Sequence, residues 1–122
     1  MKLHASGVGG ANTVTAYGAG YISVNGQRHE SSLVVLRDQI LPWAPRRFDE
    51  LNAESFAVLE KLDVDILLLG TGERQRFPRP ELTAGLRNAR IGLEVMDVQA
   101  ACRTYNILVA EERRVAAALL IE

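Results

Sequence analysis

The pattern of apolar and polar positions changes near residue 49 of the chain. Before that point, short runs rich in β-branched and aromatic residues are separated by turn signals, which is typical of strands. After it, short apolar runs alternate with segments in which apolar residues recur at helical spacing. The predicted strands span residues 13–17, 21–24, 27–32, 33–36, 40–43, 64–69, 91–96 and 115–121.

Turn residues and a proline indicate how the early strands are arranged. Asn25 and Gly26 predict a two-residue hairpin, because a type I′ turn needs a positive φ at both central positions. The return strand, residues 27–32, is polar and is expected to face water. Pro42 lacks a backbone N–H group, so the strand at residues 40–43 is expected at a sheet edge or in an irregular position.

Three helices are predicted in the second part of the chain. Asn52 can cap the first, in which Phe56, Leu59 and Leu62 recur at helical spacing. Pro80 suits the first turn of the second helix. Asp97 can cap the third, whose apolar residues between Val98 and Ala110 form one stripe.

The predicted order is a β-hairpin region followed by β-α-β-α-β-α-β. The run from Val64 to Leu69 is almost continuously apolar, which indicates a strand covered on both faces. Such alternation predicts an α/β fold with a mostly parallel or mixed sheet and helices packed on it. We expect a single domain over residues 1–122, because no linker or low-complexity segment interrupts the pattern.

Composition excludes several classes of protein. The chain has 14 basic and 15 acidic residues and a net charge of −1, without the basic excess of a nucleic-acid binder. One cysteine allows no intrachain disulfide, so nothing demands an oxidising compartment. The sequence has no apolar stretch of signal-peptide or membrane-spanning length. A cytoplasmic protein without membrane insertion is therefore expected.

The loop Gly70-Thr71-Gly72 is the first candidate for chemistry. A glycine-rich turn after a strand resembles part of a dinucleotide-binding fingerprint, but Gln75 stands where the third glycine belongs. The next helix cannot begin before Pro80, so a phosphate would lack a helix N-terminus. We therefore expect no cofactor, and the alternative is a tight turn at the end of a strand.

Cys102 could be a nucleophile only with a base nearby in space, and the two histidines are His4 and His29. Because Cys102 lies on the apolar stripe of its helix, a buried, inert thiol is the favoured interpretation. These three residues have no metal-ligand spacing, so no metal site is predicted. Catalytic residues stay unidentified, and the enzyme question stays open with a preference against catalysis.

Trp43 is the sole tryptophan, between Pro42 and Pro45. It can anchor the core, because tryptophan is highly buried on average. The alternative is a hot spot for a protein partner, since tryptophan is enriched at such sites. Core anchoring is favoured, and Trp43 stays the candidate partner-binding residue.

Three segments resemble a known family. They are residues 21–26 with Trp43 downstream, LLLGTG at 67–72, and GLEVMD with AACRTYNILVAEERRVAAALLI up to residue 121. Together they are similar to a small α/β domain of unknown function whose mitochondrial members include a complex I (NADH dehydrogenase) assembly factor. Two positions depart from the family pattern: Val98 replaces a threonine, and Glu112 replaces a glycine in a Glu-Gly-Arg turn.

The resemblance implies a three-layer fold with a central mixed sheet and packed helices, and it transfers no catalytic residues. Two hypotheses follow. The first is a non-catalytic interaction or assembly-factor-like module that binds a subunit of a respiratory or other membrane complex. The second is a small-molecule-binding domain or enzyme with its site at the carboxyl ends of the parallel strands. Its candidate residues are Gly70, Thr71, Gly72, Asp97 and Arg79, the last as an anion clamp. The oligomeric state stays open.

Overall fold

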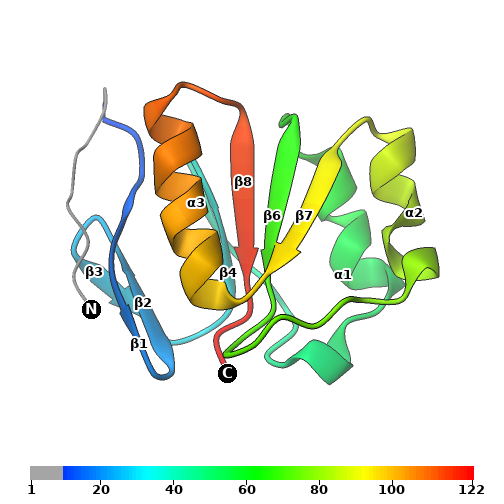
Figure 1. Cartoon of the computed structure of the whole chain (residues 1–122), viewed down its shortest axis with the longest axis horizontal. Helices are drawn as coiled ribbons and strands as arrows, with labels where there is room; N and C mark the ends of the chain where they lie inside the picture. The colour runs from blue at the N-terminus through cyan, green and yellow to red at the C-terminus, as the bar shows by residue number, and fades with distance from the viewer. Residues whose placement is uncertain (1–9) are drawn as a thin grey trace.

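A computed structural model describes residues 10–122, in which two β-sheets and three α-helices pack together (Figure 1). His4 lies outside the described residues. The strands are β1 (Val14–Gly18), β2 (Tyr21–Val24), β3 (Gln27–His29), β4 (Leu33–Leu36), β5 (Ile40–Pro42), β6 (Ile66–Gly70), β7 (Gly92–Met96) and β8 (Val115–Leu119). The helices are α1 (Ala53–Ala57), α2 (Pro80–Asn88), α3 (Val98–Ala110) and the 3-10 turns η1 (Phe48–Glu50) and η2 (Leu59–Lys61).

The larger sheet is mixed. Its strand order is β5-β4-β8-β6-β7, with β6 parallel to β7 and β8 and with β4 antiparallel to β5 and β8. β1, β2 and β3 form a separate antiparallel sheet. The α/β fold with a mixed sheet that the sequence predicts is therefore confirmed.

Two apolar cores lie on opposite faces of the larger sheet. Because side chains alternate along a strand, Leu68 of β6 belongs to the core with α3 and the small sheet, whereas Leu67 and Leu69 belong to the core with α1 and α2. These three leucines are fully buried, as expected for a strand covered on both sides. Helices and the small sheet thus enclose the larger sheet between two outer layers (Figure 1).

The small sheet is joined to α3 by polar contacts as well as by packing. The side-chain amide of Asn106 accepts a hydrogen bond from the Val14 N–H group and donates one to the Val14 carbonyl. The Tyr105 hydroxyl donates to the Asn12 carbonyl at 2.8 Å. These bonds satisfy backbone groups of β1 and of the segment before it that the small sheet leaves unpaired.

The predicted turn between β2 and β3 has the positive φ angles that its sequence requires. Asn25 and Gly26 have φ values of 53° and 82°, which confirms the type I′ turn between β2 and β3. Glu112 also has a positive φ, 61°. There the N–H groups of Glu112 and Arg113 donate to the carbonyls of Val109 and Leu108 and close α3 as a Schellman motif.

Several predicted boundaries were wrong. The polar strand expected over residues 27–32 ends at His29, and Ser32 is buried instead of facing water. Residues 30–32 carry the chain between the two sheets, where the Ser32 hydroxyl accepts the Ile121 N–H. The first helix is only Ala53–Ala57, and Leu59 lies in η2, because spacing of three residues also suits a 3-10 turn. The strand expected over residues 115–121 ends at Leu119.

Glycine at position 112 is expected to stabilise the fold. Left-handed backbone is strained for glutamate but not for glycine, so Glu112→Gly should stabilise the folded state. Glycine also makes the unfolded chain more flexible, which opposes this gain, and the net increase in the free energy of unfolding should be about 0.5–1 kcal/mol. Urea denaturation measures this change. Arg113→Gly is the matched control and should destabilise the protein, because Arg113 is not among the residues with positive φ. Equal effects of the two substitutions would contradict the assignment.

Candidate functional site

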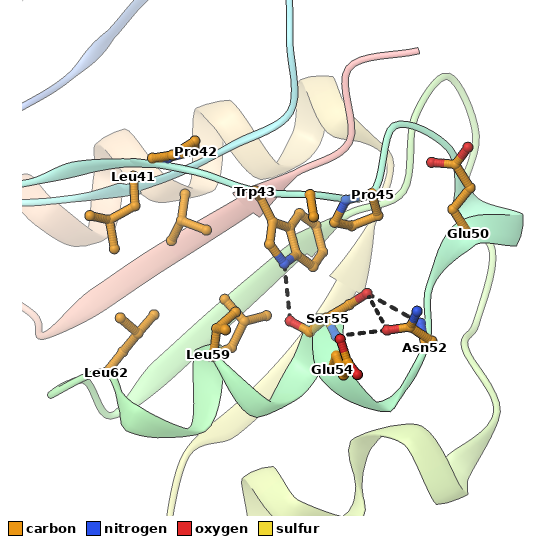
Figure 2. Close-up of a pocket in the computed structure, with 13 residues that line it drawn as sticks. Leu41, Pro42, Trp43, Pro45, Glu50, Asn52, Glu54, Ser55, Leu59 and Leu62 are labelled. Carbon is orange, nitrogen blue, oxygen red and sulfur yellow. Dashed lines mark hydrogen bonds between the residues drawn. The ribbon is translucent and has the colours of Figure 1, made fainter.

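A pocket of about 460 Å³ opens between the β5 edge of the larger sheet and the α1–η2 segment (Figure 2). Its apolar lining comes from the sheet on one side and from the helical segment on the other. We call it the Trp43 groove and define it by Val34, Leu41, Trp43, Val58, Leu59 and Leu62, with Glu50, Asn52, Glu54 and Ser55 as polar lining. The volume lies within the range of about 300–1,000 Å³ that is common for binding pockets.

The Trp43 ring joins the two sides of the groove. Its indole Nε1 donates a hydrogen bond of 3.0 Å to the Ser55 carbonyl in α1 (Figure 2). The ring meets Phe56 edge-on at 6.4 Å, and only 5% of Trp43 is exposed. Its backbone N–H donates to the Ser32 carbonyl. Trp43 therefore anchors the core, as the sequence favoured, and also lines the groove; its role in partner binding stays a proposal.

A capping box holds the start of α1 on the helical side of the groove. The Asn52 side chain accepts from the Ser55 N–H at 2.9 Å, and the Ser55 hydroxyl accepts from the Asn52 N–H at 3.2 Å. This reciprocal capping box satisfies donors at the start of the helix and fixes where α1 begins. A five-residue helix is too short to be stable alone, so its position depends on the cap, the Trp43 bond and the burial of Phe56 in the core.

The rim of the groove combines one exposed apolar side chain with two carboxylates. Val58 is 53% exposed, although large apolar residues are usually more buried. Glu50 and Glu54 are exposed, and an oxygen of Glu50 accepts the Arg46 N–H at 2.8 Å. The groove thus offers an apolar floor beside negative charge.

The carboxyl end of β6 is occupied by packing. A Cβ at Gly70 would lie 3.0 Å from the Leu119 side chain and 3.1 Å from Ala101 Cβ and Val98 Cα. The Gly70 backbone therefore meets the first turn of α3 directly. Thr71 is fully buried, and its hydroxyl donates to the Arg74 carbonyl and accepts the Arg76 N–H. The Thr71 hydroxyl thus makes these hydrogen bonds within its own loop.

An internal ion pair stands beside Gly72. The Arg76 Nη2 donates to a Glu122 carboxylate oxygen at 2.9 Å and to the Thr71 carbonyl at 3.1 Å. The Arg76 guanidinium also lies 4.8 Å from the centre of the Phe48 ring. The arginine that pairs with an anion beside Gly72 is thus Arg76, which the sequence analysis did not single out, and its anion is the Glu122 carboxylate of the same chain.

The candidate residues of the strand-end site are distributed over separate places. Gly72 lines a pocket of about 140 Å³ with residues of the β1–β2 turn. Arg79 lines a different pocket of about 280 Å³, beside Phe48 and Phe77. The Asp97 carboxylate accepts the Ala100 N–H at 2.9 Å and caps α3, as predicted. The structure therefore does not bring Arg79 to the same pocket as Gly72.

The thiol of Cys102 is inside the core with α3 and is fully buried. Burial raises its pKa from the ordinary 9.0 to about 12; Arg103 opposes this shift, and Asp97 adds to it. A thiol with so high a pKa stays protonated at neutral pH and is a poor nucleophile. The burial of Cys102 that the sequence favoured is confirmed, and its lack of reactivity stays a prediction.

Within residues 10–122, no group of three or more histidine, cysteine, aspartate or glutamate side chains is placed to hold a metal ion. In the same range, no helix has both the length and the apolar character needed to cross a membrane.

Sequence reasoning missed Val58, Glu50 and Glu54. A signal for Val58 was present, since it lies off the stripe of Phe56 and Leu59 and is an apolar residue on the polar side of that segment. The two glutamates carry no signal alone, because an exposed carboxylate near a helix start is ordinary. Only the position of Trp43 across from α1 makes them the rim of one groove.

A family model described as "Protein of unknown function (DUF498/DUF598)" matches residues 14–120. A crystal structure of a protein from Bordetella parapertussis is 41% identical, with a TM-score of 0.86 over 92% of this chain and 97% of that one. An uncharacterized protein of Rhodobacter capsulatus is 34% identical over 98% of this chain and 93% of its own length.

The chain is also similar to the NADH dehydrogenase (ubiquinone) 1 alpha subcomplex assembly factor 3 of Xenopus tropicalis. The two are 31% identical over 109 residues, which is 88% of this chain. The matched region is 60% of the length of that relative, so the chain corresponds to only part of the assembly factor.

The Gly70→Ala substitution tests whether this glycine serves packing. The added methyl must displace Val98 backbone or neighbouring side chains, so it should lower the free energy of unfolding by about 1–3 kcal/mol in urea denaturation. Gly92→Ala is the control, because a Cβ there would meet only the Asp65 carbonyl at an ordinary 3.5 Å. It should be neutral or slightly stabilising. A neutral Gly70→Ala would contradict the close packing.

The Cys102 thiol should react with Ellman's reagent only when the protein unfolds. Between pH 9 and about 12 the unfolded chain ionises this thiol and the folded chain does not, so stability falls as pH rises through that window. Cys102→Ala removes this contribution. Its urea denaturation should therefore depend less steeply on pH than that of the unmodified protein. Fast labelling of the native protein at neutral pH would contradict burial of the thiol.

Proposed function

The chain belongs to the DUF498/DUF598 family, and from that premise we propose that it is a non-catalytic interaction module that holds a segment of a protein partner in the Trp43 groove. The observation that carries this proposal is an apolar groove whose two walls are joined by the Trp43–Ser55 hydrogen bond and whose rim exposes Val58. Binding to a preformed groove avoids the cost of ordering it.

The reactive or charged side chains outside the groove support a module without catalysis. The Asp97 carboxylate is committed to capping α3, the Cys102 thiol is buried, and Arg76 pairs with Glu122. Each group thus has a structural role. The groove, in contrast, is larger than the pocket beside Gly72, about 460 Å³ against 140 Å³. This difference favours docking at Trp43 over a small-molecule site at the strand ends.

The similarity to complex I assembly factors suggests what kind of partner the groove holds. Those relatives are named for assembling a subcomplex of NADH dehydrogenase, and the match with the Xenopus tropicalis relative covers 88% of this chain. We therefore propose a subunit of a respiratory or other membrane complex as the partner. A segment of such a subunit that is exposed before assembly would supply apolar side chains for the groove.

Val58→Asp should prevent partner binding without unfolding the protein, because Val58 is 53% exposed. Placing a carboxylate in an apolar contact should reduce recovery of the partner at least about tenfold. The measurement is quantitative mass spectrometry of proteins that co-purify with the tagged chain from cells of its source.

Ile107→Asp is the matched control, since Ile107 is similarly exposed, at 59%, but lies on α3 outside the groove. Proteins lost with Val58→Asp and retained with Ile107→Asp support the groove. A set of co-purifying proteins that neither substitution changes would count against it.

A further inference from the structure

We propose that the segment held by the Trp43 groove is both apolar and cationic, with a lysine or arginine within a few residues of its apolar anchor. The inference rests on the proposed function and adds the chemistry of the partner segment. Its basis is the distribution of charge and apolar surface along the groove.

The charged lining of the groove is entirely negative. Among the residues that line it, Glu50 and Glu54 carry charge, and no lysine or arginine is present. Neither carboxylate takes part in an ion pair within the described residues. The arginines in such pairs contact Glu30, Asp49, Glu122, Asp63 and Asp65 instead. Two carboxylates at one rim therefore remain available to a cation from outside.

Two arginines, Arg46 and Arg47, lie close in sequence to the groove residues. Arg47 precedes the groove but lies 3.5 Å from Asp49, which offsets its charge. Arg46 does not line the groove, and its contact with Glu50 is through its backbone N–H. That bond orients the Glu50 carboxylate without neutralising it. The rim thus keeps its negative character.

The groove has a polar end and an apolar end. Its helical wall runs from Glu50 through Glu54 to Val58 and Leu62, so charge comes first along the chain and apolar side chains follow. Figure 2 shows the same order, with Glu50 and Leu62 on opposite sides of Trp43. An occupant would place its apolar anchor toward Leu62 and its cation toward Glu50.

Negative charge at the rim of a groove affects which partners bind more than it raises the affinity of binding. Negative groups at a rim speed the approach of a cationic segment and disfavour an acidic one. The contribution of each exposed pair is modest and falls with salt. The apolar floor would supply most of the affinity, and the carboxylates would decide which apolar segment is accepted.

Selection from a displayed library of random 12-residue peptides tests this chemistry directly. Sequences enriched on the unmodified protein should contain lysine or arginine close to a large apolar residue. Trp43 is the sole tryptophan and lines the groove, so binding of synthesised peptides should change its emission and yield the Kd. Glu50→Gln with Glu54→Gln keeps shape and hydrogen-bond acceptors, and it should weaken binding about 3- to 10-fold.

Three comparisons separate the outcomes. Glu94→Gln with Glu111→Gln removes the same charge at exposed positions outside the groove and should leave the Kd within about twofold. In a second outcome, the peptides no longer bind Val58→Asp, but they lack a basic bias or bind the Glu50/Glu54 variant as tightly as the unmodified protein. This outcome overturns the inference and leaves the proposed function standing. Peptides that still bind Val58→Asp, or an absence of any enriched peptide, overturn both. Circular dichroism of each variant verifies its fold.

Discussion

The direct contact of α3 with β6 is the constraint on which the rest of the structure depends. The helix crosses the sheet where Gly70 and Ala101 leave room for close packing, and larger groups there would separate the two layers. β8 contributes Ala117 to the same face, which again keeps the helix close. Because Asp97 follows β7 directly and caps α3, the position of the strand also sets where the helix begins.

The groove lies on the opposite face of the sheet, between its β5 edge and the α1–η2 segment. α1 and η2 are short, and they reach the sheet through Phe56 and Leu59. Trp43 bridges the remaining distance by donating to the Ser55 carbonyl. One buried side chain therefore stabilises the core and forms the floor of a surface site. This explains why core anchoring and a place in a binding groove are compatible roles for one tryptophan.

The strand ends illustrate how a sequence motif can have two physical origins. Glycines after a parallel strand suit phosphate binding, but they also suit close packing and tight turns. In this chain Gly70 meets α3, Gly72 has a φ of 93° beside the Glu122 carboxylate, and Arg76 supplies the neighbouring cation. Local sequence does not distinguish the two origins, because the deciding neighbours come from positions up to about fifty residues away along the chain.

The sequence by itself determined the α/β class, the type I′ turn at Asn25-Gly26, the Asp97 cap and the burial of Cys102. These features depend on backbone propensity and on periodicity within one segment, which local residues control. Only the tertiary structure decided that Ser32 is buried, that the first helix is five residues long, and that Val58, Glu50 and Glu54 border one groove with Trp43. Each of these depends on which distant segments meet across the sheet, and that pairing is set by the packing of the whole domain.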